Sequence, residues 1–409
     1  MPADRNYTKI YVTPKVEKSL RNGHPWVFQD EVTAIDGTYE NGQLVDVLSS
    51  KDKYLGTGFI NDNSKILVRV VSTNTNDSFD RAFYERRIRY ALNYRRTVMP
   101  NEFNCCRLIF GEADGIPGIT VDRYDSVLVI QSLCLGTDLI KPMLIEILLV
   151  LLAEMGESID TVYERNDLPV REREGMQQYT GFYEADNLKT DSNGKIIITE
   201  NGIRFQIDYI NGQKTGYYLD QKYNRLAVAK ISKDRNVLDC FCHTGSFALN
   251  AAQAGAASVT AVDVSKAAIN LVQENAKLNN LQRNMTYVNA DVFEFLTELS
   301  RSSSHPYDLI ILDPPAFTKS SSRIKNAIGG YRQINQMAMR ILPRGGYLAT
   351  CSCSHFVTDT HFRALLRQAA TDVSVSLRQI EARQQAPDHP ILWNVPETNY
   401  LKFYIFQVI

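Results

Sequence analysis

The C-terminal half of the chain predicts an α/β fold built on a doubly wound, Rossmann-like parallel sheet. Five short apolar runs recur there, each ending beside polar residues, with stretches long enough for helices between them. These runs are residues 237–239, 259–263, 285–288, 309–313 and 347–350. Two further strands follow, near 374–378 and 401–408. An ordinary dinucleotide-binding domain lacks such a terminal pair of strands, so this sheet is of a different kind.

The N-terminal half predicts two smaller domains. Short alternating strands separated by Asn-Gly and Asp-Gly turns, at 10–12, 44–48 and 66–71, predict a small β-rich domain. A small α+β middle domain follows, with helices at 78–97 and 138–155 and strands at 107–110, 127–131 and 161–164. We therefore expect domains at 1–75, 76–190 and 195–409.

Size, charge and cysteine content restrict the class of protein. The chain has 409 residues, too many for one ordinary domain, and a net charge of −1, so any RNA-binding surface must be local. Its seven cysteines, with nothing like an export signal in residues 1–21, favour reduced thiols in the cytoplasm. The apolar segment 143–152 is too short to span a membrane and contains Glu146, so we expect a buried helix and no membrane partner.

The predicted helix at 78–97 carries many arginines. Phe79, Phe83, Ile88 and Leu92 are spaced for one apolar face. The arginines are Arg81, Arg86, Arg87, Arg89, Arg95 and Arg96. They form either a solvated face or a surface that contacts RNA phosphates, with Arg86 and Arg87 as the candidate contacts.

The loop after the first core strand, residues 239–247 (DCFCHTGSF), has one glycine and opens a helix. It is therefore not the glycine-rich fingerprint that closes around a pyrophosphate, and it suits S-adenosylmethionine, which has no phosphate. Its candidate ligands are Asp239, Phe241, Thr244 and Gly245.

Two more acids end the next strands. Asp263 lies 24 positions after Asp239, a spacing that suits a carboxylate holding the ribose hydroxyls. Asp291 follows the third strand and is placed to accept from the adenine amino group. Either acid alone also fits a helix cap.

Asp313, Pro314, Pro315 and Phe317 end the fourth strand in the sequence DPPAF. Two prolines fix an extended backbone and remove amide donors, which leaves carbonyls to face a base. Phe317 can stack on that base or form a wall beside it. Asp-Pro-Pro followed by an aromatic residue is typical of enzymes that methylate a nitrogenous base.

Cys351 and Cys353 end the fifth strand in the sequence TCSCS. Methylation of a pyrimidine at carbon 5 requires a thiolate that first adds to carbon 6. Cys353, just past the strand and flanked by serines, is the better nucleophile, while Cys351 lies nearer the sheet. A four-thiolate zinc site with Cys240 and Cys242 is an alternative that the Cys-x-Cys spacing disfavours, so we expect no metal.

These motifs resemble the class I S-adenosylmethionine-dependent RNA 5-methylcytosine methyltransferases, most closely the large-subunit (23S) ribosomal RNA cytosine-C5 methyltransferase family. Residues 23–28 (GHPWVF) resemble its N-terminal PUA domain, an RNA-binding module, and 111–118 (GEADGIPG) its middle domain. Residues 214–221 (KTGYYLDQ) resemble the segment beside the cofactor, which implies that Tyr218 and Gln221 contact it. Residues 388–390 (DHP) resemble a late segment of the family.

One departure from the family pattern concerns product release. Many RNA 5-methylcytosine enzymes carry a second cysteine where this chain has Pro315-Ala316, so another group must remove the carbon-5 proton. Asp313, Asp388 and His389 are the candidates.

The resemblance implies a cytosine-C5 methyltransferase acting on ribosomal RNA, with Cys353 and Asp313 as catalytic residues. Two alternatives stay open: an RNA base N-methyltransferase acting on an exocyclic amine or guanine, and an inactive RNA-binding or assembly protein. A homodimer is compatible with the sequence but not specified by it.

Overall fold

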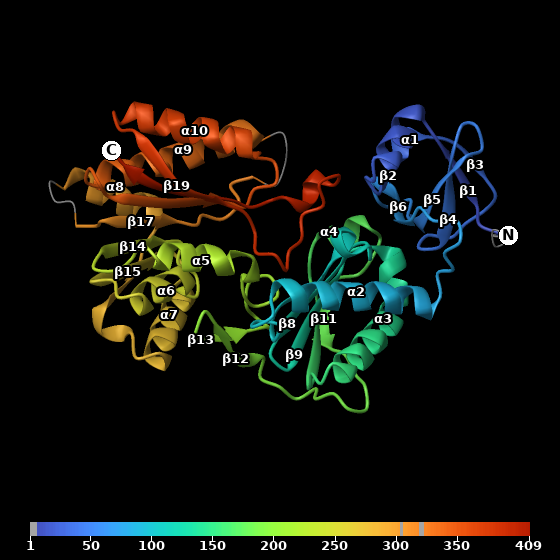
Figure 1. The fold of residues 1–409 in the computed structure, drawn as a ribbon, viewed down its shortest axis with the longest axis horizontal. Coiled ribbons are helices and arrows are strands. Elements are labelled where there is room, and N and C mark those ends of the chain that lie inside the picture. The colour runs from blue at the N-terminus through green and yellow to red at the C-terminus, as the bar shows by residue number, and fades with distance from the viewer. Residues whose placement is uncertain (1–5, 303–305, 319–322) are drawn as a thin grey trace. The chain divides into compact units, whose positions relative to one another are not determined.

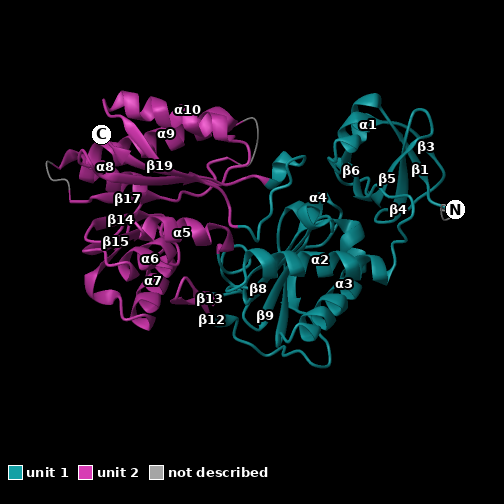
Figure 2. Ribbon diagram, viewed as in Figure 1, with its two compact units in different colours: residues 1–196, 208–217, 387–398 teal, residues 197–207, 218–386, 399–409 magenta. Residues whose placement is uncertain are grey.

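The computed structural model describes residues 6–302, 306–318 and 323–409, which form two compact units (Figures 1 and 2). The first unit comprises residues 1–196, 208–217 and 387–398. The second comprises residues 197–207, 218–386 and 399–409. The chain therefore passes between the units more than once, and the late segment 387–398 returns to the unit of the N-terminus.

The N-terminal part of the first unit is a six-stranded sheet in the order β2-β6-β5-β4-β1-β3. Its strands are β1 (Lys9–Val12), β2 (Trp26–Phe28), β3 (Val32–Asp36), β4 (Leu44–Ser49), β5 (Tyr54–Ile60) and β6 (Ile66–Ser72). The prediction of a β-rich domain is confirmed, but the sequence analysis missed α1 (Pro14–Arg21), which packs Val16 and Leu20 into the core. Pro14 begins this helix because its fixed φ suits a first turn.

The rest of the first unit is a five-stranded sheet, β11-β10-β9-β8-β7, with helices. The strands are β7 (Cys105–Phe110), β8 (Ile119–Tyr124), β9 (Val127–Ser132), β10 (Thr161–Asn166) and β11 (Tyr179–Phe182). The helices are α2 (Arg81–Val98), α3 (Leu135–Glu154) and α4 (Val170–Arg173). The apolar segment 143–152 lies within α3 and is mostly buried. Among the described residues, no helix is long and apolar enough to cross a membrane.

The second unit is built on a seven-stranded sheet in the order β16-β15-β14-β17-β18-β20-β19. The strands are β14 (Asn236–Cys240), β15 (Ser258–Asp263), β16 (Met285–Asn289), β17 (Leu309–Leu312), β18 (Tyr347–Ser352), β19 (Leu377–Arg383) and β20 (Lys402–Val408). The first five run parallel, while β20 is antiparallel to both of its neighbours. A separate hairpin, β12 (Lys195–Glu200) and β13 (Ile203–Asp208), precedes this sheet.

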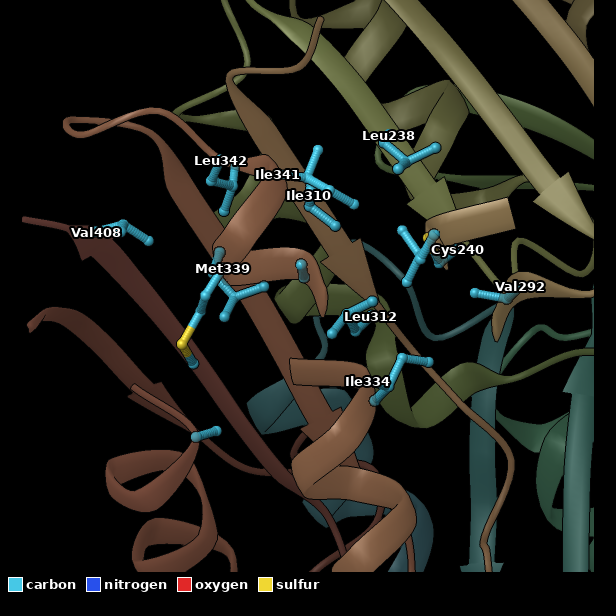
Figure 3. Close-up of a cluster of buried hydrophobic side chains, with 14 of the residues drawn as sticks. Leu238, Cys240, Val292, Ile310, Leu312, Ile334, Met339, Ile341, Leu342 and Val408 are labelled. Atoms are coloured by element: carbon cyan, nitrogen blue, oxygen red, sulfur yellow. The ribbon is translucent and has the colours of Figure 1, made fainter. Parts of the chain in front are cut away.

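Helices cover both faces of the seven-stranded sheet (Figure 1). The helices on one face are α5 (Lys222–Ala229), α6 (Ser246–Gln253) and α7 (Lys266–Leu278). Those on the other are α8 (Val292–Arg301), α9 (Ile324–Ile341) and α10 (Asp359–Asp372). Leu238, Ile310 and Leu312 of the sheet pack against Ile334 and Met339 of α9 in a buried cluster (Figure 3). The predicted doubly wound α/β fold is confirmed.

The two terminal strands differ in detail from the prediction. β19 begins at Leu377, because Ser374 has a positive φ of 56° and turns the chain after α10. The strands pair directly, but the long segment between them includes residues 387–398 of the first unit. They are therefore neighbours in the sheet without being a tight hairpin.

Candidate functional site

The predicted site residues of the second unit gather at the carboxyl ends of its parallel strands. Asp239 lies at the end of β14, Asp263 at the end of β15, and Asp313 directly after β17. Cys351 lies in β18 and Cys353 follows it. Because neighbouring parallel strands end at one edge, the topology alone brings these acids and thiols to the same side of the sheet.

The loop between β14 and α6 has a strained backbone. Phe241, His243 and Gly245 have φ values of 63°, 49° and 78°. A side chain at Gly245 would clash with Val272, since an added Cβ would lie 2.6 Å from its Cγ1. Strained backbone of this kind persists where the surroundings enforce it, often at ligand sites.

Asp239 is a buried acid that anchors this loop through a hydrogen bond to the backbone. Its side chain is fully buried, and its Oδ2 accepts a hydrogen bond from the Ala248 amide at 2.9 Å. Burial raises the pKa of the Asp239 carboxyl well above its ordinary value. Among the described residues, its Oδ1 has no hydrogen-bond partner, and neither has Oγ1 of the buried Thr244.

Asp263 also holds backbone amides. It accepts from His243 N at 3.0 Å and from Ser265 N at 2.8 Å, one on each carboxylate oxygen. Its partly exposed carboxylate retains free acceptor positions, because each oxygen can take two hydrogen bonds. Next to it, the Val264 side chain is 69% exposed, an apolar surface that the sequence analysis did not single out.

Asp291 begins α8 as its N-cap. The carboxylate accepts from Glu294 N at 3.1 Å, and the side chain is exposed. The helix-cap interpretation is therefore confirmed for this acid. Its exposure also leaves room for the predicted contact with adenine, because one carboxylate can do both.

Asp313, Gln221 and Cys351 form a hydrogen-bonded triangle. Cys351 donates its thiol to Asp313 Oδ1 at 2.7 Å, and Gln221 donates to the same oxygen at 3.2 Å. Gln221 also lies 3.4 Å from Cys351 Sγ. Gln221 is positioned in turn by Asn224, which donates to its Oε1 at 2.6 Å. This network orients Asp313.

The two cysteines have different environments. Cys351 is fully buried, and burial together with the Asp313 carboxylate raises the pKa of its thiol well above the ordinary value. Cys353 is partly exposed, and all six other cysteines of the chain are buried. A neutral, buried thiol is a poor nucleophile, so the geometry favours Cys353 over Cys351.

The DPPAF segment follows β17 at this edge. Pro314 is buried and Pro315 is exposed. The Phe317 ring packs against Tyr331, with ring centroids 4.5 Å apart, and against Phe293 at 6.0 Å. Phe317 is thus held by other aromatic rings, which suits a wall better than a freely stacking side chain.

Tyr218 lies close to the strained loop. Its ring contacts His243 edge to face, with centroids 5.1 Å apart. Burial, together with Asp313 and Cys353, raises the pKa of its hydroxyl well above the ordinary value, so Tyr218 stays neutral. This places the residue beside the expected cofactor loop.

Lys402 is a residue of this edge that the sequence analysis missed. It begins β20 and is only 6% exposed. Its Nζ donates to the carbonyl of Ser354 at 2.6 Å and to that of Tyr400 at 2.9 Å. A single lysine in the apolar run 401–406 (LKFYIF) was the available signal.

Arg86 and Arg87 lie in the first unit, on α2. Arg87 donates to the carbonyls of Val71 at 2.9 Å and Gly115 at 3.2 Å. Arg86 is about half exposed and lies 3.6 Å from Asp77. Both line a groove of about 750 Å³ whose other lining residues include Tyr90, Tyr94 and Leu392.

The expected basic face of α2 is smaller than the sequence suggested. Arg95 is fully buried and pairs with Asp114 at 2.5 Å. Arg81 and Arg89 pair with glutamates at 3.0 Å. Three arginines of this helix are exposed, namely Arg81, which is paired, Arg86 and Arg96.

Asp388 and His389 also belong to the first unit, and both are buried there. Asp388 accepts from Arg107 N at 2.8 Å, and its other oxygen lies 2.9 Å from His389 Nδ1. Their polar atoms thus hold internal contacts of that unit. Within the described ranges, no three His, Cys, Asp or Glu side chains are grouped to hold a metal ion.

Comparison with known proteins defines the class. Residues 177–407 match the family model for S-adenosylmethionine-dependent methyltransferases, and residues 10–73 match a PUA-like domain. A putative S-adenosylmethionine-dependent methyltransferase from Streptococcus mutans has a similar fold, with a TM-score of 0.81, 21% identity and coverage of 98% of this chain and 99% of that one. A putative methyltransferase crystallised with SAH gives a TM-score of 0.82 at 20% identity, with coverage of 98% and 99%. The chain is an S-adenosylmethionine-dependent methyltransferase with a PUA-like domain.

Curated relatives narrow the family. Ribosomal RNA large subunit methyltransferase I of Pseudoalteromonas atlantica is 38% identical over 404 residues, covering 98% of this chain and all of the relative. The protein of the same name from Aliivibrio fischeri is 36% identical over 402 residues, covering 98% and 99%. The chain belongs to the ribosomal RNA large subunit methyltransferase I family.

The residues at the sheet edge fit the cofactor S-adenosylmethionine. Asp263 offers acceptors for hydroxyl groups, and the exposed Val264 offers an apolar surface beside it. Among the described residues, the buried Asp239 Oδ1 and Thr244 Oγ1 have no hydrogen-bond partner, and both lie at the loop where a polar ligand would be expected. Acidic groups at this edge also suit the positive charge of a sulfonium.

Proposed function

We propose that this protein methylates carbon 5 of a cytosine in ribosomal RNA, in the cytoplasm, through a covalent bond between the base and Cys353. The observation that carries the proposal is the placement of Cys353. Cys353 is a partly exposed thiol at the carboxyl edge. It directly follows β18, the strand in which the Cys351 thiol donates to Asp313. Relatives named for ribosomal RNA of the large subunit support the choice of RNA.

Carbon 5 of cytosine is not nucleophilic until a thiolate adds to carbon 6. In the proposed mechanism the Cys353 sulfur forms a bond to carbon 6, and the electrons of the carbon 5–carbon 6 double bond move toward carbon 5. Asp313, oriented by Gln221 and Cys351, accepts a hydrogen bond from the amino group of the base. Bound S-adenosylmethionine supplies the methyl group to carbon 5.

Release of the product reverses the addition. A base removes the carbon-5 proton, the double bond forms again, and its formation expels the Cys353 thiolate. Asp388 and His389 hold contacts inside the first unit, which favours Asp313 among the three candidate proton acceptors. Pro314, Pro315 and Phe317 are assigned to hold the base against this edge.

Cofactor binding is assigned to the loop and the strand-end acids. Asp263 receives the ribose hydroxyls and Asp291 the adenine amino group. Phe241, Thr244 and Gly245 form the surface of the loop. Asp239, Tyr218 and Gln221 support it from within, through the Ala248 amide, the His243 ring and Asp313 respectively.

RNA binding is assigned to the PUA-like domain and to the groove along α2. Tyr90 is 65% exposed and Tyr94 38%, and both line the groove beside Arg86. Exposed tyrosines next to an arginine suit unpaired bases and their phosphates. Arg87, whose guanidinium faces backbone carbonyls, is assigned to hold the groove's shape.

The test of this function is nucleoside analysis of ribosomal RNA. RNA from a strain lacking the gene should lose one 5-methylcytidine from the large subunit, by mass spectrometry. The purified protein should restore it in the presence of S-adenosylmethionine, while Cys353→Ala should not. Activity that survives Cys353→Ala would instead indicate methylation of an exocyclic amine, which needs no thiol.

A further inference from the structure

Lys402 occupies a position at the edge of the sheet that the mechanism above does not use. In the register of β18 and β20 it lies opposite Ser352, the residue between Cys351 and Cys353. Its side chain is 6% exposed. A buried lysine costs free energy unless its charge has a purpose or a partner, so its presence beside two thiols needs an explanation.

The contacts of Lys402 lead to the turn that carries Cys353. Its Nζ donates to the carbonyl of Ser354, which immediately follows Cys353, at 2.6 Å. A second N–H goes to the Tyr400 carbonyl at 2.9 Å. The amide of Ser354 contacts Ser352 Oγ at 3.3 Å, so the turn is held from both sides. Lys402 thereby fixes the backbone on which the Cys353 side chain is carried.

Two thiols and one acid act electrostatically on Lys402. Cys353, Cys351 and Asp359 interact electrostatically with its ammonium, while burial lowers the pKa of Lys402 to about 8. Cys351 is kept neutral by burial and by Asp313. Tyr218 and Tyr331, which interact with Cys353, also stay neutral because burial raises the pKa of each hydroxyl. Cys353 is therefore the group at this edge whose ionisation the ammonium can favour.

We propose that Lys402 is a positioning residue that fixes the Cys353–Ser354 turn and, in its ammonium form, stabilises the Cys353 thiolate. The inference rests on the proposed function, in which Cys353 is the nucleophile. The thiol loses its proton to solvent, and the sulfur lone pair then forms the bond to carbon 6. When the product is released, that electron pair returns to sulfur beside the same ammonium. One cation thus assists both the formation and the breaking of the bond.

The experiment measures the ionisation of Cys353 without RNA. Because the other six cysteines are buried, iodoacetamide should label Cys353 first, and mass spectrometry of its peptide gives the rate at each pH. Lys402→Met removes the charge and Lys402→Arg keeps it. In Lys402→Met the midpoint of the pH profile should rise, and labelling near neutral pH should slow by about tenfold, the effect of roughly one pKa unit. Lys402→Arg should remain close to the wild type.

Two results would overturn the inference. An unchanged profile in Lys402→Met would show that the ammonium does not act on the thiol. An equal shift in Lys402→Met and Lys402→Arg would show that only the shape of the turn matters. S-adenosylmethionine binding by calorimetry verifies that each variant is folded, and Lys402→Gln replaces the Met variant if that one does not bind.

The same variants separate this inference from the proposed function. If Cys353 still forms a covalent adduct with RNA but its labelling profile does not respond to Lys402, the inference fails and the carbon-5 mechanism stands. If the profile responds but no adduct forms, Lys402 acts on Cys353 as inferred and the carbon-5 mechanism is wrong.

Discussion

Buried charge is handled differently in the five-stranded sheet of the first unit and at the carboxyl edge of the seven-stranded sheet. In the first unit, buried charges of opposite sign are paired directly. Arg95 lies 2.5 Å from Asp114 and Arg107 lies 2.7 Å from Asp122. At the edge of the second unit, Asp239 accepts from a backbone amide, and Asp313 accepts from an amide side chain and a thiol.

The difference distinguishes a scaffold from a site. A paired charge stabilises one arrangement and has little left to offer a ligand, whereas an acid whose hydrogen bonds come from neutral donors can still respond to a cationic ligand. These acids lie at the edge to which the proposed function assigns the sulfonium cofactor. The predictions below test whether the paired charges are structural and the edge charges functional.

The largest expected effect is on the stability of the first unit. Replacing Arg95 by Met leaves Asp114 buried without its partner, which should lower the free energy of unfolding by about 3–5 kcal/mol. Arg96→Met, one position along on the exposed side of the helix, should change it by less than about 0.5 kcal/mol. Chemical denaturation followed by circular dichroism measures both. A loss below about 1 kcal/mol in Arg95→Met would contradict the structural role of the pair.

Lys402 should make the free energy of unfolding depend on pH. Its pKa falls from 10.5 to about 8 on folding, so between these values the unfolded chain binds more protons and stability rises with pH. The free energy of unfolding of the wild type should therefore gain up to roughly 3 kcal/mol over Lys402→Met across that range. Denaturant titrations of the two proteins at several pH values give this difference, from which the titrating groups that Lys402 does not affect cancel. A difference that does not change with pH would mean that Lys402 titrates normally.

Asp263→Ala should weaken binding of S-adenosylmethionine by roughly 1–3 kcal/mol, because the hydroxyl groups of the ligand lose a charged acceptor. Asp263→Asn keeps the size of the side chain and one acceptor oxygen, so its loss should be smaller. Isothermal titration calorimetry measures both. If the affinity of the Ala variant equals that of the wild type, Asp263 only holds the His243 and Ser265 amides.

The smallest expected effect concerns RNA. Arg86→Glu should weaken RNA binding and lower the slope of its salt dependence by about one contact, because the residue is half exposed at the α2 groove. Arg378→Glu makes the same change in net charge on β19 and should leave the slope unaltered. Filter binding at several salt concentrations measures both, and cofactor affinity should not change. Equal slopes for the wild type and Arg86→Glu would mean that the arginines of this helix form a solvated face and do not contact RNA.

The sequence predicts the parts of the site that depend on strand ends. Buried parallel strands appear as continuous apolar runs, and the polar residue that follows each run marks the edge of the sheet. Asp263, Asp313 and Cys353 could be placed at one edge for that reason. The roles of these residues in binding and catalysis stay predictions.

Features that depend on contacts between distant residues were not visible in the sequence. Lys402 reaches the turn after Cys353 only through the antiparallel register of β18 and β20. Arg87 and Arg95 have the same residue type as the exposed Arg86, and only their carbonyl and carboxylate partners distinguish them. Helix α1 is short, so its two buried residues, Val16 and Leu20, gave too weak a periodic signal.

The most direct test of the central claim is covalent capture of Cys353. RNA carrying 5-fluorocytosine cannot lose the carbon-5 substituent as a proton, so the adduct formed after methylation should persist. With S-adenosylmethionine, the wild type and Cys351→Ala should form a complex with this RNA that survives denaturing electrophoresis, and Cys353→Ala should form none. A complex that depends on Cys351 instead would identify that residue, in the buried strand β18, as the nucleophile. Methylation without any complex, in both variants, would contradict the carbon-5 mechanism.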